Sequence, residues 1–141
     1  MADKTTGELQ QELMEQPNIK AYLRENQSFF DAEHIAELLE ALRVRYGLTK
    51  SELARRAGMS DVYLYQVLAG RRNPSRDRLL SVCVALGASL EETQRVLRLG
   101  GWAQLYPKLR RDAIIIHGLM HRHGLSQIND TLYMENEKTL A

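Results

Sequence analysis

The chain has 141 residues, of which 44% are hydrophobic, with a single cysteine and a formal net charge of +1. This composition excludes wholesale disorder, an internal disulfide and a cysteine-based zinc cluster, and the length suits one domain with its own core. No apolar stretch approaches the roughly 20 residues that a bilayer requires, and the N-terminus has no apolar signal-peptide segment. We therefore expect a cytoplasmic protein.

The charges are unevenly distributed along the chain. Residues 1–42 contain three basic and nine acidic residues, whereas residues 43–78 contain nine basic and three acidic residues. A concentrated basic segment predicts a polyanionic partner, because each neutralised phosphate releases counterions. The acidic N-terminal segment is expected to be either a packed appendage or an arm that binds a protein partner.

Capping residues predict the first two helices. Thr5 and Glu8 have the spacing of a capping box and predict a helix that ends near Pro17. A short turn could follow through residues 19–23. Asp31 is a good N-cap for the next helix, which Gly47 is expected to end.

Four more helices are expected between residues 49 and 99. Thr49 and Glu52 begin a short helix, Gly58 makes a turn, Ser60 caps a second short helix, and Gly70 closes it. Ser75 then caps a helix that Gly87 ends, and a further capping box begins the last one. The capping positions of this segment are Thr49, Glu52, Ser60, Ser75, Ser89 and Glu92. Several helices in series, with no strand-like alternation, predict an all-α fold.

The pattern changes after Gly100 and Gly101. Asp112 is expected to cap a helix that Gly124 stops, and Ser126 to start a final helix. Residues 102–134 are a candidate dimer surface or an addition to the core. Their large apolar residues include Trp102, Leu105, Tyr106 and Ile114 to Ile116.

The segment from about residue 45 to residue 97 resembles the XRE/Cro/C1-type helix-turn-helix family of bacterial and phage regulators. The matching residues are Leu48-Thr49, Glu52 to Ala54, Gly58 to Ser60, Gly70, Arg72 to Ser75, Leu79-Leu80 and Leu86 to Glu92. The resemblance implies a compact, lambda-repressor-like bundle. The expected domains are an acidic helical arm (1–30), the helix-turn-helix domain (31–99), a C-terminal helical extension (100–134) and a tail (135–141).

In such a motif the first helix crosses the DNA backbone and the second enters the major groove. The resemblance implies phosphate contacts from the basic residues around the motif, although these could instead form a solvated basic loop with surface ion pairs. It implies base contacts at the start of the second helix. The implied DNA-binding residues are Lys50, Ser60, Asp61, Val62, Tyr63, Tyr65, Gln66, Arg71, Arg72 and Arg76.

The groove-facing residues depart from the family pattern at the first two positions, Asp61 and Val62, where family members often carry Gln, Arg, Ser or Thr. Gln66 suits adenine, and Val62 suits the thymine methyl group. Tyr63 and Tyr65 could donate to phosphates or pack on neighbouring helices. Asp61 could accept from a cytosine amine, but phosphates repel it, and a carboxylate in the first turn of a helix is stabilised by the helix dipole whatever the function.

The predicted function is that of a sequence-specific DNA-binding transcriptional regulator, acting as a homodimer on double-stranded DNA. The alternative is a helix-turn-helix scaffold that binds an acidic or phosphorylated protein partner without binding DNA. Asp61 and the acidic arm favour that alternative.

No catalytic arrangement is evident, so an enzyme is not expected. His117 and His121 have the i, i+4 spacing of metal ligands, but they lack the glutamate of an HExxH motif and an obvious third ligand. We expect neither a metal nor a cofactor, and we expect Cys83 to be a small core residue.

Overall fold

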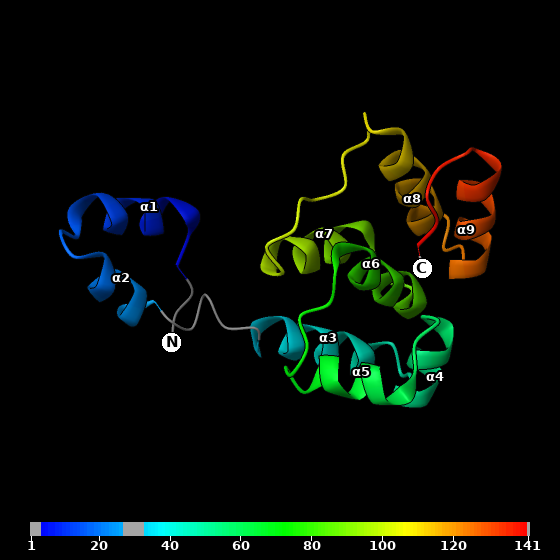
Figure 1. Cartoon of the computed structure of the whole chain (residues 1–141), viewed down its shortest axis with the longest axis horizontal. Coiled ribbons are helices and arrows are strands. Elements are labelled where there is room, and N and C mark those ends of the chain that lie inside the picture. Colours follow the sequence, from blue (N-terminus) through cyan, green and yellow to red (C-terminus); the bar gives the residue numbers. More distant parts are fainter. Residues whose placement is uncertain (1–3, 27–32, 141) are drawn as a thin grey trace. The chain divides into compact units, whose positions relative to one another are not determined.

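The computed structural model describes residues 4–26 and 33–140, and the chain divides into two compact units, Met1–Asp31 and Ala32–Ala141. All regular secondary structure in the described residues is helical, which confirms the all-α prediction (Figure 1). None of the helices in these ranges is long and apolar enough to cross a membrane.

The first unit contains two short helices, α1 (Thr6–Glu15) and α2 (Ile19–Glu25). The predicted capping box of Thr5 and Glu8 is present, and α1 ends just before Pro17, as expected. Asn26 joins the two helices, because its side-chain amide donates to Glu12 over 2.8 Å while its oxygen accepts from Lys4 over 2.8 Å. The predicted N-cap of the next helix, Asp31, lies outside the described residues.

The second unit begins with a five-helix bundle. Its helices are α3 (Glu33–Arg45), α4 (Lys50–Arg56), α5 (Asp61–Leu68), α6 (Arg76–Leu86) and α7 (Leu90–Leu99). The capping boxes at Thr49 and Ser89 are both present, and the side chains of Ser60 and Ser75 accept backbone N–H groups as predicted. The turn between α4 and α5 needs a positive φ of 68° at Gly58, which a residue without a Cβ adopts at little cost.

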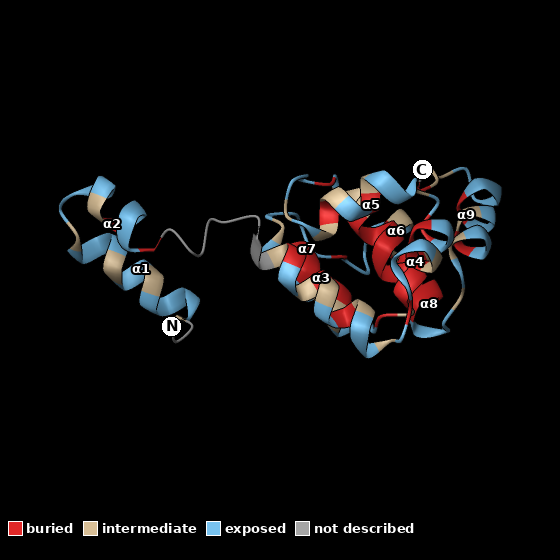
Figure 2. Cartoon of the chain, turned by 90° about the horizontal axis from the view of Figure 1, so that it is seen from below, coloured by how far each residue is buried: buried red, intermediate tan, exposed pale blue. Residues whose placement is uncertain are grey.

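Helix α6 lies at the centre of this unit. All eight residues from Leu79 to Leu86 are buried, which leaves no solvent-facing side over those two turns (Figure 2). Burial raises the pKa of the Cys83 thiol to about 12, since the thiolate would lose its hydration. Cys83 therefore behaves as a small core residue, as the sequence predicts.

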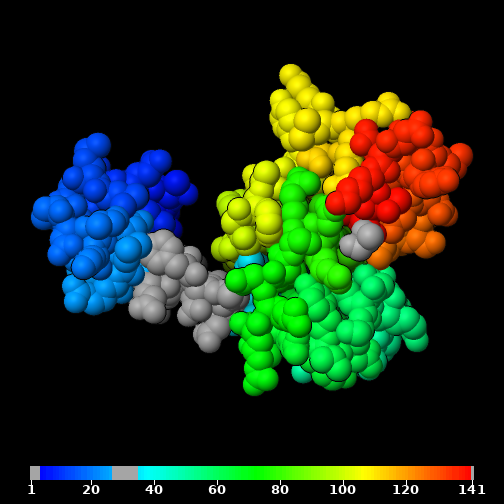
Figure 3. All heavy atoms as spheres, in the orientation of Figure 1, coloured from blue at the N-terminus to red at the C-terminus, as the bar shows by residue number. Residues whose placement is uncertain are grey.

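Helices α8 (Arg110–Met120) and α9 (Leu125–Met134) complete the second unit. Ile115, Leu119, Ile128 and Leu132 join the same buried cluster as α6. The tail also packs, because Leu140 is buried and its backbone exchanges two hydrogen bonds with the side chain of Asn129. Figure 3 shows this C-terminal segment lying against the α6 region.

Three predicted helix boundaries in this region are wrong. Helix α8 starts at Arg110, with Leu109 and not Asp112 at the N-cap position, because the Asp112 carboxylate is engaged in tertiary contacts. The helix ends at Met120, before Gly124. Gly124 instead occupies the N-cap position of α9, so that helix starts one residue before Ser126.

Candidate nucleic-acid interface

Helix α5 presents the predicted groove-facing residues to solvent. Leu64 and Val67 are buried against the core, so the opposite side of the helix faces outward. Val62 is 66% exposed and Tyr65 is 45% exposed. An apolar residue this exposed at the start of a helix is available to a partner that offers a methyl group or a flat ring.

The start of α5 is fixed by two polar contacts. The hydroxyl of Ser60 accepts the backbone N–H of Tyr63 over 3.1 Å, so Ser60 holds the first turn of the helix. Asp61 accepts a hydrogen bond from the Ser51 hydroxyl of α4 over 3.4 Å, so its carboxylate lies beside α4. Both residues are exposed, so they remain reachable by a partner.

The ring of Tyr63 in α5 contacts two of the basic residues that follow the helix. The guanidinium carbon of Arg72 is 5.4 Å from the centroid of the Tyr63 ring, and that of Arg78 is 4.6 Å away. Both distances are typical of cation–π contacts. The Nε atom of Arg72 also donates to the side-chain oxygen of Gln66 over 2.8 Å. The guanidinium groups of Arg72 and Arg78 therefore both lie beside α5, in contact with the Tyr63 ring.

Arg78 is a site residue that the sequence does not reveal. It is the third residue of α6, and nothing in the local pattern distinguishes it from an ordinary surface arginine. Only the tertiary fold brings its guanidinium to the Tyr63 ring of α5.

On the other side of α5, the Lys50 ammonium lies 5.6 Å from the centroid of the Tyr65 ring. Lys50 is the first residue of α4, so its charge lies next to the exposed side of α5. Arg71 is exposed, and its backbone N–H bonds to the Gln66 carbonyl over 2.8 Å, which closes the end of α5.

The cations around α5 form no ion pairs within the described part of the chain. No carboxylate of the described residues forms an ion pair with Lys50, Arg71, Arg72 or Arg78. Some arginines elsewhere in this unit are paired, for example Arg43 with Glu40 and Arg45 with Glu92. Four cations without an ion pair among the described residues thus lie around the exposed side of α5.

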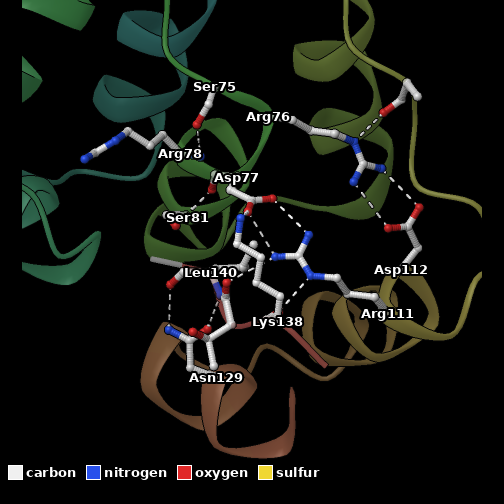
Figure 4. Close-up of polar contacts among 12 residues, drawn as sticks. Ser75, Arg76, Asp77, Arg78, Ser81, Arg111, Asp112, Asn129, Lys138 and Leu140 are labelled. Carbon is white, nitrogen blue, oxygen red and sulfur yellow. Dashed lines mark hydrogen bonds and ion pairs between the residues drawn. The ribbon is translucent and has the colours of Figure 1, made fainter. Parts of the chain in front are cut away.

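Arg76 is arranged differently from the other predicted phosphate contacts. Its guanidinium donates to the carbonyl oxygens of Ala103 and Gln104 over 2.9 and 3.3 Å, and it pairs with the buried Asp112. Figure 4 shows Arg76 and Arg78 extending from α6 in opposite directions, with Arg76 pointing to Asp112. The structure therefore does not group Arg76 with the unpaired cations.

A second ion pair lies beside this one. The guanidinium of Arg111 binds both carboxylate oxygens of Asp77, over 2.9 and 3.1 Å (Figure 4). The same guanidinium donates to the carbonyls of Lys138 and Thr139. Two consecutive residues of α6, Arg76 and Asp77, thus pair with two consecutive residues of α8, Asp112 and Arg111 respectively.

The histidines near the end of α8 form a small group. The ring centroids of His117 and His121 are 4.2 Å apart. The ring centroid of His123 lies 5.7 Å from that of His117 and 5.9 Å from that of His121, and the sequence spacing did not indicate that this third histidine is close. In the ranges that the structure describes, no three His, Cys, Asp or Glu side chains are arranged to hold a metal ion.

Comparison with known proteins identifies the family of the segment that contains α4 and α5. Residues 34–96 match the family model of a helix-turn-helix domain. This part of the chain is a helix-turn-helix domain. The match confirms the family resemblance, extends it to α3, and ends before α8 and α9. No curated protein and no solved structure matches the chain.

The matched range includes α4 and α5, the two helices that the sequence predicts to form the motif. In motifs of this kind the second helix lies in the major groove, so the family points to DNA binding and not to catalysis.

Proposed function

We propose that the chain is a sequence-specific DNA-binding transcriptional regulator whose α5 lies in the major groove. The observation that carries the proposal is the group of unpaired cations around Tyr63, where Arg72 and Arg78 approach one ring without a carboxylate of the described residues as a partner. Like charges held together in this way favour an anionic partner.

The residues divide into two roles. Lys50, Arg71 and Arg78 bind phosphates on either side of α5 and position the domain, while Val62 and Gln66 face base edges. Tyr65 is exposed enough for its hydroxyl to donate to a phosphate. Arg76 is left out of the proposed contacts because its guanidinium is already bound by Asp112 and two carbonyl groups.

We further propose that the regulator acts as a homodimer, since a single domain with few base contacts binds weakly and two half-sites add their energies. The candidate contact is the segment between α7 and α8, where Trp102, Tyr106 and Leu109 are 42, 49 and 56% exposed. Sedimentation of the full chain over a range of concentrations tests this; a monomer at all concentrations, with and without DNA, would rule it out.

The central experiment is a titration of the full chain with fluorescent duplex DNA of mixed sequence at low and at moderate salt. We expect binding that weakens steeply with salt, because phosphate contacts release counterions. Replacing Arg71 and Arg72 with alanine should abolish most of it. Arg98, an exposed arginine of α7, provides the matched control, and Arg98→Ala should bind almost as the wild type does.

Absence of duplex binding at low salt by the folded protein would contradict the proposal. It would favour the scaffold alternative, in which the same cations bind an acidic or phosphorylated protein segment. Asp61, exposed at the start of α5, is the observation that favours this second candidate.

A further inference from the structure

We infer that Arg72 reads a guanine in the major groove, with Gln66 and Tyr63 holding its guanidinium in place. This inference rests on the proposed function and adds to it the base that the regulator selects. The sequence alone suggests a phosphate contact for Arg72 and an adenine contact for Gln66.

The contacts of Arg72 leave one edge of its guanidinium available. Its Nε atom donates to Oε1 of Gln66 over 2.8 Å, and its guanidinium carbon lies 5.4 Å from the Tyr63 ring centroid. Neither terminal nitrogen donates to any other residue that the structure describes, and the side chain is exposed. The two terminal NH₂ groups therefore remain available to an outside acceptor.

The same hydrogen bond changes what Gln66 can do. A bidentate contact with adenine needs the amide oxygen to accept from N6 and the amide nitrogen to donate to N7. Because Oε1 of Gln66 already accepts from Arg72, one of its two lone pairs is engaged and the amide is oriented toward the guanidinium. Gln66 is thus a positioning residue for Arg72 in this arrangement.

The available edge of Arg72 matches guanine. Guanine presents two acceptors in the major groove, O6 and N7, whereas adenine presents one acceptor and one donor. A guanidinium has only donors, in a rigid planar fork, so it satisfies both guanine acceptors and leaves the adenine amine unsatisfied. Contacts that hold the fork before binding reduce the conformational freedom lost on binding.

The Arg78 side chain strengthens this arrangement. It occupies a second cation–π position on Tyr63, 4.6 Å from the ring centroid, with no carboxylate of the described chain paired to it. A phosphate near Arg78 would position the duplex backbone while Arg72 reaches the base edge. Substitutions of the two arginines should therefore have different effects. Phosphate contacts carry no sequence information, so losing one weakens binding to all sequences, whereas losing a base contact changes the sequence preference.

The test starts with selection of bound duplexes from a random pool by the full chain. A guanine should be enriched at one position of each half-site. Replacing that guanine with 7-deazaguanine, which lacks the N7 acceptor, should weaken wild-type binding by roughly five- to a hundredfold. Arg72→Lys retains the charge but loses the fork, so the base replacement should have little further effect on this variant. Arg71→Lys, at the neighbouring exposed arginine, should remain as sensitive as the wild type.

Gln66→Ala provides the second variant, because it removes the positioning contact and leaves Arg72 in place. It should reduce the preference for guanine over adenine while retaining the salt dependence of binding. Circular dichroism checks that each variant is folded. If duplexes bind but 7-deazaguanine affects wild type and Arg72→Lys equally, the inference is overturned and Arg72 contacts phosphate. If no duplex binds, the proposed function fails, and the inference fails with it.

Discussion

Arg76 and Asp112 face each other between α6 and α8, with Nη2 3.0 Å from Oδ2 and Nη1 3.3 Å from Oδ1. Asp112 is only 3% exposed, and the same carboxylate accepts the backbone N–H of Tyr106 over 3.0 Å. Removing the arginine would leave a buried carboxylate without its counter-charge.

We therefore expect Arg76→Ala to lower the free energy of unfolding by about 3 kcal/mol, as measured by urea denaturation. Adding Asp112→Asn should recover part of that loss, because the remaining group is uncharged. A variant Arg76→Ala that is as stable as the wild type but defective in DNA binding would show that Arg76 acts on phosphate and not on the fold.

Close packing between α8 and α9 gives a second prediction. A Cβ on Gly118 would lie 2.4 Å from Cγ1 of Ile128, which is itself only 1% exposed. Gly118→Ala should therefore destabilise the protein by about 1–3 kcal/mol through overpacking, seen as a lower thermal midpoint. Gly124→Ala is the control, since its Cβ would meet no atom within 4 Å.

A double-mutant cycle tests the contact between Gly118 and Ile128. If Ile128 causes the clash, the combined loss of Gly118→Ala and Ile128→Ala should be smaller than the sum of the single losses. Additive losses would mean that Gly118 is constrained by something other than Ile128.

Glu92 provides a prediction about pH. Partial burial opposes its ionisation, but hydrogen bonds from the Tyr46 hydroxyl and from Ser89 outweigh this and lower the pKa of Glu92 below its usual 4.5. Because the folded pKa is lowered, the carboxylate stabilises the fold above about pH 4.5, and this contribution is lost as the pH falls through the lower folded value.

Glu92→Gln should therefore be less stable than the wild type at neutral pH, by about 1 kcal/mol, with the difference shrinking in strongly acidic buffer. Denaturant titrations over a range of pH measure this. Glu91→Gln, at the exposed neighbouring position, should match the wild type throughout. A Glu92→Gln deficit that persists unchanged in acid would mean that the effect is not due to the charge.

Arg78 gives a prediction that separates it from Arg72. Arg78→Gln should weaken binding to all duplexes alike, and the slope of log affinity against log salt should fall by about 1, as for one lost phosphate contact. Equal effects of Arg78→Gln and Arg98→Gln would show that only net charge matters.

Most helix boundaries of the helix-turn-helix domain could be predicted from the sequence, because the residues that set them are close together in the chain. A capping box such as that of Thr49 and Glu52 depends on residues three apart, and a turn such as that at Gly58 depends on one backbone conformation. Asp112 shows the limit of predictions that use only local sequence patterns. A carboxylate near a helix start looks like a cap, but tertiary contacts with Arg76 and Tyr106 engage it here.

The candidate site was predicted in part for the same reason. The family pattern identifies α5 and its neighbouring basic loop, but it does not distinguish arginines with different partners. Arg76 and Arg78 are two residues apart, yet one pairs with Asp112 and the other lies over Tyr63. That difference depends on which neighbouring helix each side chain meets, and no local pattern encodes it.

The burial of α6 from Leu79 to Leu86 bears on whether the helix-turn-helix domain can fold by itself. A helix with no solvent-facing side over two turns needs neighbours all around it, and here α9 and the C-terminal segment supply part of that cover. Cutting the chain after α7, just beyond the end of the family match, would expose apolar surface on α6 and leave Asp77 without Arg111. We therefore expect that the helix-turn-helix domain does not fold without α8 and α9, and that α3 to α9 unfold together in one cooperative transition.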